Sequence, residues 1–542
     1  MLNKVIAKIT NSIINRKAAN RNLKPLELHL IFPEAAPFSQ TGGLGEVGEG
    51  LPKALAELGH KVILHIPKHT GSIENALKRN MIPEFFNPKI QHQIGGKVHE
   101  ADIYEIKVIP GLDVHLYDTK KFDFFGGRTY GTPYSYEDDV KRFYYFNLIA
   151  AEMIARRKME TGNKNIIAHT HDWQAAHTMT LLKSQFAHAN VPGFHTIHNL
   201  KYYNDISLHN FFVMSGITDA DSPGLYTEDG LKVPLTDAAN PSYAAFMMAD
   251  HVKTVSPNYV QEVISSDYFG YRFVDVLKKR YEDGTFTGTI NGVAQEWYPK
   301  YNHSNFMEPK AQEKANLQNF LGLKKDPDAF LLMMAARFDS QKGFPILNSI
   351  MEELHTEHKI NLQFMINASI GVDQGQNIVN ELDRLNHQST INGRIGMLVP
   401  YDRLLTEQIY RAGDVGIIPS RFEPCGLVAP TCIVNGTFPI GRKIGGIADI
   451  IQHGVNGRHF EGMWYDKVGD DRFNLLRDRL MKQVIHTHKI FQNKDTWNDL
   501  ISQMMKNENL SWRVPAEAHV EEYRETISKF QKVGHYKAFG HF

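Results

Sequence analysis

The chain has 542 residues, and its 60 lysines and arginines balance 60 aspartates and glutamates, so its formal net charge is zero. This balance excludes a general attraction to nucleic acid or anionic lipid and favours neutral or locally charged small molecules as partners. The two cysteines, Cys425 and Cys432, are too few for a disulfide framework and suit a reducing cytoplasm. The length predicts two or more domains, and the lack of an 18-residue apolar run argues against a transmembrane helix.

Residues 1–25 form a basic N-terminal extension with six lysines and arginines and no acidic residue. Its apolar residues recur at near-helical spacing, and a basic amphipathic segment can contact a membrane or direct import. The segment lacks the uncharged apolar region and the cleavage site of a secretory signal. A solvated extension without membrane contact is the simpler interpretation, because chain ends are commonly loosely ordered.

From residue 26 onward, short apolar runs alternate with amphipathic segments. The first block predicts a strand at residues 28–32, a helix at 45–58 and a strand at 61–66, which together form a βαβ unit. Each run is followed by polar residues, glycine or proline, as expected where strands end in loops. The same block predicts further strands at residues 165–169, 193–197 and 251–255.

A second block begins after a poorly patterned stretch at residues 293–325, which is interpreted as an interdomain connection. Two blocks of alternating strands and helices predict an α/β protein with two Rossmann-like, doubly wound parallel-sheet domains. Their ligands are expected in a central cleft, at the carboxyl ends of the strands. The second block predicts strands at residues 330–336, 363–366, 394–399, 415–419 and 437–440.

The predicted domain boundaries follow from these blocks. The N-terminal domain spans residues 26–292 and the C-terminal domain spans residues 326–512. Residues 513–542 contain a last amphipathic helix, and no short-period repeat or low-complexity tract interrupts either domain.

The first candidate binding segment is glycine-rich and runs from Gln40 to Glu46, between a predicted strand and a predicted helix. Gly42 and Gly43 allow a ligand to approach the backbone closely, and the N–H groups at a helix start favour an anion such as a diphosphate. A tight turn between strand and helix also needs glycine for steric reasons alone, so this segment does not define a function by itself.

Two histidine-containing segments follow at predicted strand ends. His169 and His171 invite a metal interpretation, but no cysteine or acidic cluster with zinc spacing completes a site, so no metal is predicted. His198 and Asn199 lie at a predicted loop mouth, where their side chains suit hydrogen bonds to a hydroxyl-rich ligand.

A third segment carries two cations, Arg337 and Lys342, on either side of a turn after a predicted strand. Two cations in that position can bind a pyrophosphate and stabilise the charge that develops on it as it leaves. An exposed basic loop is the alternative interpretation.

The fourth segment, residues 419–427, is the most informative. Its sequence is Pro-Ser-Arg-Phe-Glu-Pro-Cys-Gly-Leu, so that Glu423 is an acid in a small and mostly apolar stretch. A position at a helix N-terminus favours the ionised carboxylate. Cys425 could act as a nucleophile, but the histidine that such a site needs is not evident nearby, and a packed thiol is favoured.

Together these segments resemble the glycogen and starch synthases, which are retaining glycosyltransferases of the two-Rossmann GT-B architecture and use a nucleotide-glucose donor. The resemblance extends from Leu28 to Phe530 and consists of many motifs in the same order, among which residues 419–427 are close to diagnostic. The other motifs include Thr41-Gly-Gly-Leu-Gly45, Asp138-x-x-x-Arg142-Phe143, His171-Asp-Trp173, Thr196-Ile-His-Asn-Leu200, Ser340-Gln-Lys-Gly343, Gly445-Gly-Ile-Ala-Asp449 and Ser511-Trp512.

The resemblance implies a role for each matching residue. Arg337 and Lys342 match the pair that holds the donor phosphates, and Glu423 matches the carboxylate that faces the transferred glucose. His198 matches the histidine beside the primary hydroxyl of the sugar, and Asn291 matches a sugar-contacting asparagine. Donor-side positions also include Gly42, Gly43, Cys425, Gly426 and Leu427, and acceptor-side positions include Asp138 and Asn199.

The same resemblance implies the partners. They are a nucleotide-sugar donor and a glucan or another hydroxyl-bearing acceptor, with no metal, no other cofactor and no nucleic acid. It also implies that the last helix crosses back onto the N-terminal domain. The oligomeric state is left open.

Several departures concentrate where donor and acceptor are expected. Gln40 replaces a lysine near the donor phosphates, and losing one charge-assisted contact costs about 1.5 to 3 kcal/mol. The other departures are Glu46 for aspartate, Ala294 for aspartate, Asn367-Ala-Ser-Ile370 for Gly-x-Gly-Asp, Val428-Ala429 for Thr-Gln, Ile444 for threonine and Tyr203-Asn204 for Gln-Gly.

Three functions follow. The first is elongation of an α-1,4-glucan from ADP-glucose or UDP-glucose. The second keeps this chemistry but transfers the sugar to a protein or a small molecule, and it is motivated by Val428, Ala429 and Tyr203. The third is a regulatory protein that binds a nucleotide-sugar or a glycan without turnover, and it is motivated by Gln40 and Ala294.

Overall fold

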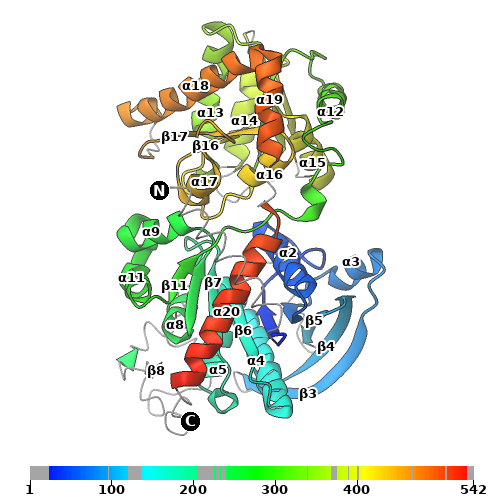
Figure 1. The fold of residues 1–542 in the computed structure, drawn as a ribbon, viewed down its shortest axis with the longest axis vertical. Helices are drawn as coiled ribbons and strands as arrows, with labels where there is room; N and C mark the ends of the chain where they lie inside the picture. The colour runs from blue at the N-terminus through cyan, green and yellow to red at the C-terminus, as the bar shows by residue number, and fades with distance from the viewer. Residues whose placement is uncertain are drawn as a thin grey trace, which may run out of the picture. The chain divides into compact units, whose positions relative to one another are not determined.

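The chain forms two compact units, Met1–Thr196 with Tyr202–His251 and His519–Phe542, and Ile197–Lys201 with Val252–Ala518 (Figure 1). Nearly all of the basic extension predicted at residues 1–25 lies outside the described residues. The computed structural model describes residues 24–94, 97–119, 136–203, 225–226, 232–233, 240–338, 340–367, 375–388, 390–399, 402–464, 468–506 and 510–533.

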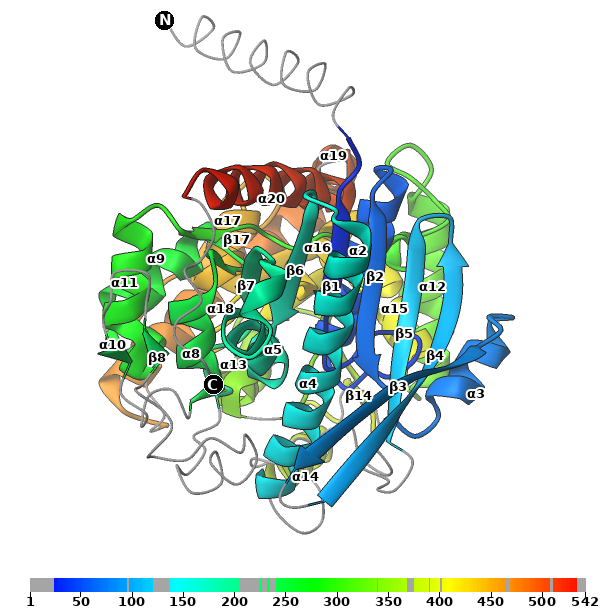
Figure 2. The same ribbon diagram turned by 90° about the horizontal axis from the view of Figure 1, so that it is seen from below.

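The larger sheet has nine strands in the order β11-β10-β7-β6-β1-β2-β5-β4-β3. Neighbours among β5, β2, β1, β6 and β7 pair parallel, which confirms the predicted fold class. Strand β4 pairs antiparallel with β3 and β5 in the long curved edge seen in Figure 2, which the sequence did not predict. The strands are β1 (Glu27–Ile31), β2 (Lys61–Pro67), β3 (Glu84–Ile94), β4 (Lys97–Ile109), β5 (Leu112–Thr119), β6 (Ile166–His171), β7 (Gly193–Ile197), β10 (His251–Thr254) and β11 (Phe286–Gly288).

Helices α4 (Tyr136–Thr161) and α5 (Asp172–Lys183) pack against each other beside β6 (Figure 2). Helix α20 (Arg513–Val533) belongs to the first unit from His519 onward, where the Tyr523 hydroxyl lies 2.6 Å from Nδ1 of His169. The other elements of the first unit are α2 (Gly43–Glu57), α3 (Ser72–Lys78), η1 (Ala187–Ala189), α8 (Pro241–Met248) and the pair β8 (Leu225–Tyr226) and β9 (Lys232–Val233).

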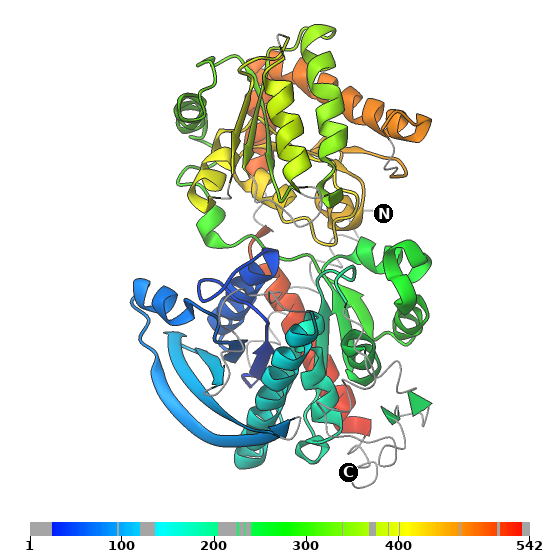
Figure 3. The ribbon, with the colours of Figure 1, turned by 180° about the vertical axis from the view of Figure 1, so that it is seen from behind.

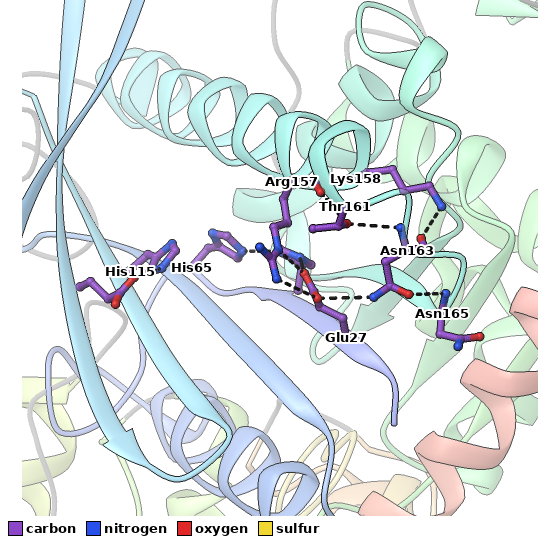
Figure 4. A network of polar contacts seen from close by, with 10 residues as sticks. Glu27, His65, His115, Arg157, Lys158, Thr161, Asn163 and Asn165 are labelled. Atoms are coloured by element: carbon purple, nitrogen blue, oxygen red, sulfur yellow. Dashed lines mark hydrogen bonds and ion pairs between the residues drawn. The ribbon is translucent and has the colours of Figure 1, made fainter. Parts of the chain in front are cut away.

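A chain of buried polar groups runs through the first unit. Glu27 on β1 accepts a hydrogen bond from Nε of Arg157 at 2.8 Å and one from Nδ2 of Asn163 at 3.4 Å (Figure 4). Burial alone would raise the pKa of Glu27, but hydrogen bonds from His29 and Arg157 hold it well below its usual range. The carboxylate is therefore ionised and anchors one end of the chain.

The chain continues through neutral histidines. Nδ1 of His29 lies 2.9 Å from Nε2 of His65, and Nδ1 of His65 lies 2.5 Å from the hydroxyl of Tyr117. Nε2 of His29 lies 3.4 Å from Glu27. One set of tautomers satisfies every link: Tyr117 donates to His65, His65 donates to His29, and His29 donates to Glu27. Burial lowers the pKa of both histidines, which agrees with this neutral arrangement.

The smaller sheet lies in the second unit and has six parallel strands in the order β14-β13-β12-β15-β16-β17. Its central strands are apolar along their whole length, as expected for a sheet covered on both faces, and all five predicted strands are confirmed. The strands are β12 (Phe330–Ala335), β13 (Leu362–Asn367), β14 (Ile395–Leu398), β15 (Val415–Ile418), β16 (Phe438–Arg442) and β17 (Arg458–Phe460).

Helices cover this sheet, and two of them, α13 and α14, lie side by side (Figure 3). Within the described ranges, no helix of either unit has the length and apolar character that crossing a membrane requires. The helices are α9 (Pro257–Ser265), α10 (Asp267–Gly270), η2 (Tyr271–Phe273), α11 (Val274–Glu282), η3 (Gln295–Trp297), α12 (Met307–Phe320), η4 (Ser340–Lys342), α13 (Phe344–Thr356), α14 (Gly375–Asn386), α15 (Arg403–Ala412), α16 (Val428–Val434), α17 (Gly445–Ile450), α18 (Asp471–Gln492) and α19 (Lys494–Met505).

The observed units differ from the predicted domain boundaries in several places, among them residues 197–201 and 513–518, which belong to the second unit. Residues 252–292, assigned by sequence to the N-terminal domain, belong to the second unit, because α9 packs against α17. Residues 293–325, interpreted as a connection, contain α12, which packs on α15 and buries Lys310 and Lys314. The sequence pattern of α12 is weak because its buried face includes these lysines.

Candidate functional site

The central feature of the second unit is an ion pair between two loops at strand ends. Nζ of Lys342, on η4 after β12, lies 2.8 Å from Oε2 of Glu423, which follows β15. The Ser420 hydroxyl donates to the same oxygen at 2.9 Å. Both side chains are largely but not fully buried, at 16% and 13% exposure for Lys342 and Glu423. Two residues that the sequence singled out separately are thus brought into direct contact.

The two loops are also joined through their backbones. The Arg421 N–H donates to the Gln341 carbonyl at 2.7 Å, and the Gln341 side-chain amide donates to the Phe422 carbonyl at 3.0 Å. Gly343 has a φ of 78°, and a Cβ atom there would lie 2.1 Å from the Pro419 carbonyl oxygen. Only glycine fits this conformation and this approach, which explains the glycine after Lys342.

Arg442 on β16 holds the loop of residues 419–427, the carboxylate loop, in place through hydrogen bonds. Its Nη1 donates to the Arg421 carbonyl at 2.7 Å, and its Nε and Nη2 donate to the Gly462 carbonyl at 3.0 and 2.8 Å. Burial lowers the pKa of Arg442 from its usual value. The guanidinium is a structural clamp that orients the loop preceding Glu423.

The Gly445-Gly446 pair allows the start of α17 to contact the Glu423 backbone closely. The Gly446 N–H donates to the Glu423 carbonyl at 3.1 Å, and a Cβ atom at Gly445 would lie 2.1 Å from that oxygen. Ile444 replaces the threonine expected before this pair and gives α17 no side-chain cap. Glu262 of α9 supplies the missing acceptor, because its Oε1 accepts from the Gly445 N–H at 2.9 Å.

Cys425 lies in the wall of this site and not among its reactive groups. Burial raises the pKa of its thiol to about 12, in spite of a hydrogen bond with the Asn291 backbone. The thiol is therefore packed and protonated at neutral pH, and the same contact brings Asn291 beside the loop. Gly426 has a φ of 78°, and a Cβ atom there would meet Ile447 at 2.5 Å. Leu427 follows as the N-cap of α16.

Three other predicted site residues also belong to the second unit. Arg337 is half-buried, two residues after the end of β12. His198 follows β7 directly and is half-buried, and the preceding Ile197 carbonyl accepts from the Thr254 hydroxyl at 2.9 Å. The Asn199 side chain accepts from the Lys201 N–H at 3.2 Å, which stabilises a local turn.

The first unit holds the glycine-rich segment. The Thr41 N–H donates to Oε2 of Glu34 at 2.6 Å, and backbone hydrogen bonds from Gly42 and Gly45 also reach this carboxyl. Burial nevertheless raises the pKa of Glu34 to about 7. The backbone N–H groups of this turn, expected to face a diphosphate, thus have a carboxyl of the same unit as partner.

Gln40 makes its contacts within the same segment. Its Nε2 atom lies 3.4 Å from the Gly42 carbonyl and 3.5 Å from Oε1 of Glu46. Gly43 begins helix α2 after the N-cap residue Gly42. The amide of Gln40 therefore closes the turn on itself, where a lysine would present a charge.

Two further candidates from the sequence, Asp138 and His169, lie in the first unit. Asp138 lies in α4, but its side chain is outside the described residues. His169 was considered as a metal ligand, and both of its ring nitrogens have partners: Nδ1 lies near Tyr523 and Nε2 lies 2.7 Å from the Thr196 hydroxyl. Among the described residues, no group of three or more histidine, cysteine, aspartate or glutamate residues could hold a metal ion.

Sequence reasoning missed four residues that build the site: Glu34, Glu262, Ser420 and Arg442. Ser420 lies inside the strongest motif, so its place next to Glu423 could have been suggested. No local pattern marks the other three, and the contact of Glu262 with Gly445 spans 183 residues.

Two Rossmann-like units, of which the second presents a carboxylate and a cation at strand ends, define a glycosyltransferase of the GT-B class. Residues 29–279 match the starch synthase catalytic domain, and residues 318–489 match the glycosyl transferases group 1. The chain belongs to the glycogen and starch synthase family and is a glucosyltransferase of the glycogen synthase type.

Individual relatives agree with this assignment. The glycogen synthase of Clostridioides difficile (strain 630) is 27% identical over 522 residues, which cover 92% of this chain and 99% of that protein. The glycogen synthase of Clostridium novyi (strain NT) is 29% identical over 518 residues, which cover 92% and 98%. The catalytic domain of starch synthase IV from Arabidopsis thaliana, solved with ADP and acarbose, has a TM-score of 0.76 and 26% identity, with 93% of this chain and 100% of that chain covered.

Proposed function

We propose that this glucosyltransferase transfers glucose from ADP-glucose or UDP-glucose to the end of an α-1,4-glucan, with retention of configuration. The observation that carries the proposal is the contact between Lys342 and Glu423 at 2.8 Å, at the carboxyl ends of two neighbouring strands. The contact supports one site in which a cation and a carboxylate act on the same substrate. The plant starch synthase that resembles this chain was solved with ADP, which makes ADP-glucose the first donor to test.

In the proposed reaction, the bond between C1 of glucose and the diphosphate oxygen breaks, and a bond from an acceptor hydroxyl to C1 forms on the same face. The acceptor proton passes to the departing diphosphate. Lys342 and Arg337 stabilise the negative charge on the diphosphate, and Glu423 orients the sugar and stabilises oxocarbenium-like positive charge. Lys342 exchanges part of its contact with Glu423 for the phosphate as the donor binds.

The remaining predicted residues complete the proposed site. His198 contacts the primary hydroxyl of the sugar, and Asn291 also contacts the sugar. Gly42 and Gly43 lie next to the diphosphate, and Asp138 lies on the acceptor side with Asn199. The backbone of residues 425–427 lines the donor pocket, and no metal takes part.

The direct test is transfer of radiolabelled glucose from ADP-glucose and UDP-glucose to glycogen, with Glu423→Ala as the inactive control. The proposal expects incorporation by the wild type and a loss of about 10²- to 10³-fold in the variant. Equal incorporation by the two proteins would remove Glu423 from the mechanism.

A second candidate function is transfer to a protein or small-molecule acceptor. It is favoured by Val428 and Ala429, which begin α16 five and six residues after Glu423 in place of the expected polar pair. Labelling a cell lysate separates the two functions, because a labelled protein band without elongation of glycogen supports only this one. Binding of donor without turnover in either assay would instead support a regulatory protein.

A further inference from the structure

A cavity of about 300 Å³ lies in the second unit beside the carboxylate loop. Its lining is mainly aromatic, with Tyr259 from α9, Tyr268 and Phe269 from α10, Tyr271 from η2, and Phe422 from the loop itself. Aromatic rings supply flat apolar faces, and tyrosines add hydroxyl groups at the ring edge. This volume is at the lower end of the range of small-molecule sites.

Three charged side chains complete the lining: Lys201, Asp267 and Arg421. Nε of Arg421 donates to the Tyr268 hydroxyl at 2.7 Å, and its guanidinium carbon lies 5.6 Å from the Tyr268 ring centroid. Nζ of Lys201 lies 5.1 Å from the Phe422 ring centroid. Both cations are therefore held against aromatic faces.

The backbone around the cavity is unusual at one residue. Tyr271 has a φ of 52° and a ψ of −138°, a positive-φ conformation that is costly for a residue with a bulky side chain. Such strain persists only where the surrounding structure over-determines it, and it recurs at ligand sites.

The cavity shares a loop with the reaction site. Phe422 lines the cavity and directly precedes Glu423, and Ser340 lines it two residues before Lys342. The Gln341 contacts to Arg421 and Phe422 described above join these two segments. A molecule that occupies the cavity therefore contacts the same two loops that carry the ion pair.

We propose that this cavity is a saccharide subsite that takes a segment of an α-glucan outside the reacting position. Flat apolar faces with hydroxyl groups at the ring edges suit a neutral, hydroxyl-rich ring, and both cations of the lining are already engaged by aromatic faces. The choice of glucan among saccharides rests on the proposed function. The subsite holds a long acceptor in place between successive transfers.

The test is isothermal titration of the full chain with maltoheptaose in the absence of donor. Tyr268→Ala removes the ring that packs with Arg421, and Tyr281→Ala on α11 is the matched control. The two tyrosines have nearly the same exposure, 46% and 44%, but Tyr281 is not part of the cavity lining. The proposal expects about tenfold weaker binding in Tyr268→Ala and unchanged binding in the control. Tyr268→Phe, which keeps the ring, is expected to retain most of the affinity.

Equal affinity for the wild type, Tyr268→Ala and Tyr281→Ala would overturn the proposal. Binding of AMP that depends on Tyr268, without maltoheptaose binding, would overturn it in favour of a base-binding site. The proposed function is tested separately by glucose transfer in the wild type. If the wild type transfers no glucose while maltoheptaose binding depends on Tyr268, the subsite is supported and the proposed function is rejected. If the wild type transfers glucose while maltoheptaose binding does not depend on Tyr268, the proposed function is supported and the subsite is rejected.

Discussion

The two units bury their polar groups in different ways. Among the described residues, ten histidines are buried in the first unit and one, His459, in the second. The second unit instead has a largely aliphatic and aromatic core with buried lysines, such as Lys310 and Lys314. The ten in the first unit are His29, His60, His65, His69, His169, His171, His177, His195, His251 and His519.

This difference separates the pH windows in which the units change stability. Burial lowers the pKa of His60, His69 and His177 to about 4, so the native first unit binds fewer protons than the unfolded chain between about pH 4 and 6.5. The raised pKa of Glu34 acts in the opposite direction, but the three histidines outnumber it, so the unfolding free energy of the first unit falls as the pH falls through this window. Burial also lowers the pKa of several histidines in the second unit, such as His459 and His488, but it lowers the pKa of Lys310 to about 7, which gives this unit a further window between about pH 7 and 10.5.

The largest expected effect is selective loss of the first unit in acid. At pH 5, each histidine that titrates near 4 contributes about 2 kcal/mol less stability than at pH 7, and the effects of several such histidines accumulate. Hydrogen exchange at pH 5 and 7, corrected for intrinsic rates, is expected to show lost protection in β1, β2 and β6 before β12 and β13. Simultaneous loss in both sheets would contradict the comparison.

A substitution sharpens this prediction. His177→Phe on α5 removes one buried titrating group and is expected to reduce the acid-induced loss by about 2 kcal/mol between pH 7 and 5. His387→Phe is the control, because His387 is exposed directly after the end of α14. A pH dependence in the His177 variant equal to that of the wild type would show that burial of this histidine does not set the window.

The next effect concerns the buried ion pair of the second unit. Oδ2 of Asp414 accepts from Nζ of Lys314 and from the Leu331 N–H, both at 2.8 Å. Asp414→Asn leaves the lysine charge buried without its partner and is expected to cost about 3 to 5 kcal/mol of unfolding free energy. Urea denaturation followed by exchange in β12 and β15 measures it.

The surface offers a matched control for Asp414→Asn. Asp328 lies 3.9 Å from Nζ of Lys494 and is 81% exposed. Asp328→Asn is expected to change the unfolding free energy by less than about 1 kcal/mol. Similar losses in both variants would indicate that burial of the Lys314–Asp414 pair has no special cost.

The sequence allowed the fold to be predicted where one face or both faces of an element are apolar. β12 and β15 were predicted within one residue at each end because fully buried parallel strands are continuous apolar runs. β7 was predicted at its observed bounds and β13 within one residue at each end, although each contains polar residues. The antiparallel edge β3–β4 was missed, since its strands are partly exposed and mix charged with apolar residues. Helix α12 was missed because two lysines occupy its buried face.

The site could be predicted only as far as its local motifs reach. Lys342 and Glu423 belong to short segments with fixed chemistry, so each was identified, but their contact across 81 residues was not derivable from either segment. Glu262 acts as the cap of a helix that begins 183 residues later, and no pattern around Glu262 announces this. The replacement of threonine by Ile444 was visible in the sequence. Only the structure shows that Glu262 accepts the hydrogen bond from the Gly445 N–H in place of a side-chain cap.

A smaller expected effect concerns activity. Lys342→Met is expected to reduce kcat/KM for the donor by about 10²- to 10³-fold, because it removes the cation that contacts Glu423 and is proposed to stabilise the leaving diphosphate. The second unit contains a matched ion pair, Lys443 with Glu461, at the same 2.8 Å distance but largely exposed. Lys443→Met is expected to leave kcat/KM nearly unchanged. A similar loss in both variants would point to a general charge effect and not to the site.

The smallest expected effect concerns the first unit, where Gln40 ties the glycine-rich turn to itself through Gly42 and Glu46. Gln40→Lys introduces a charge at the position where the family has lysine, and KM for the donor is expected to fall up to about tenfold. Gln40→Met breaks the same amide contacts without adding charge. If Gln40→Met lowers KM as much as Gln40→Lys, release of the turn and not the missing charge limits donor binding. If neither changes KM, the departure at Gln40 is neutral, and the second unit alone sets donor affinity.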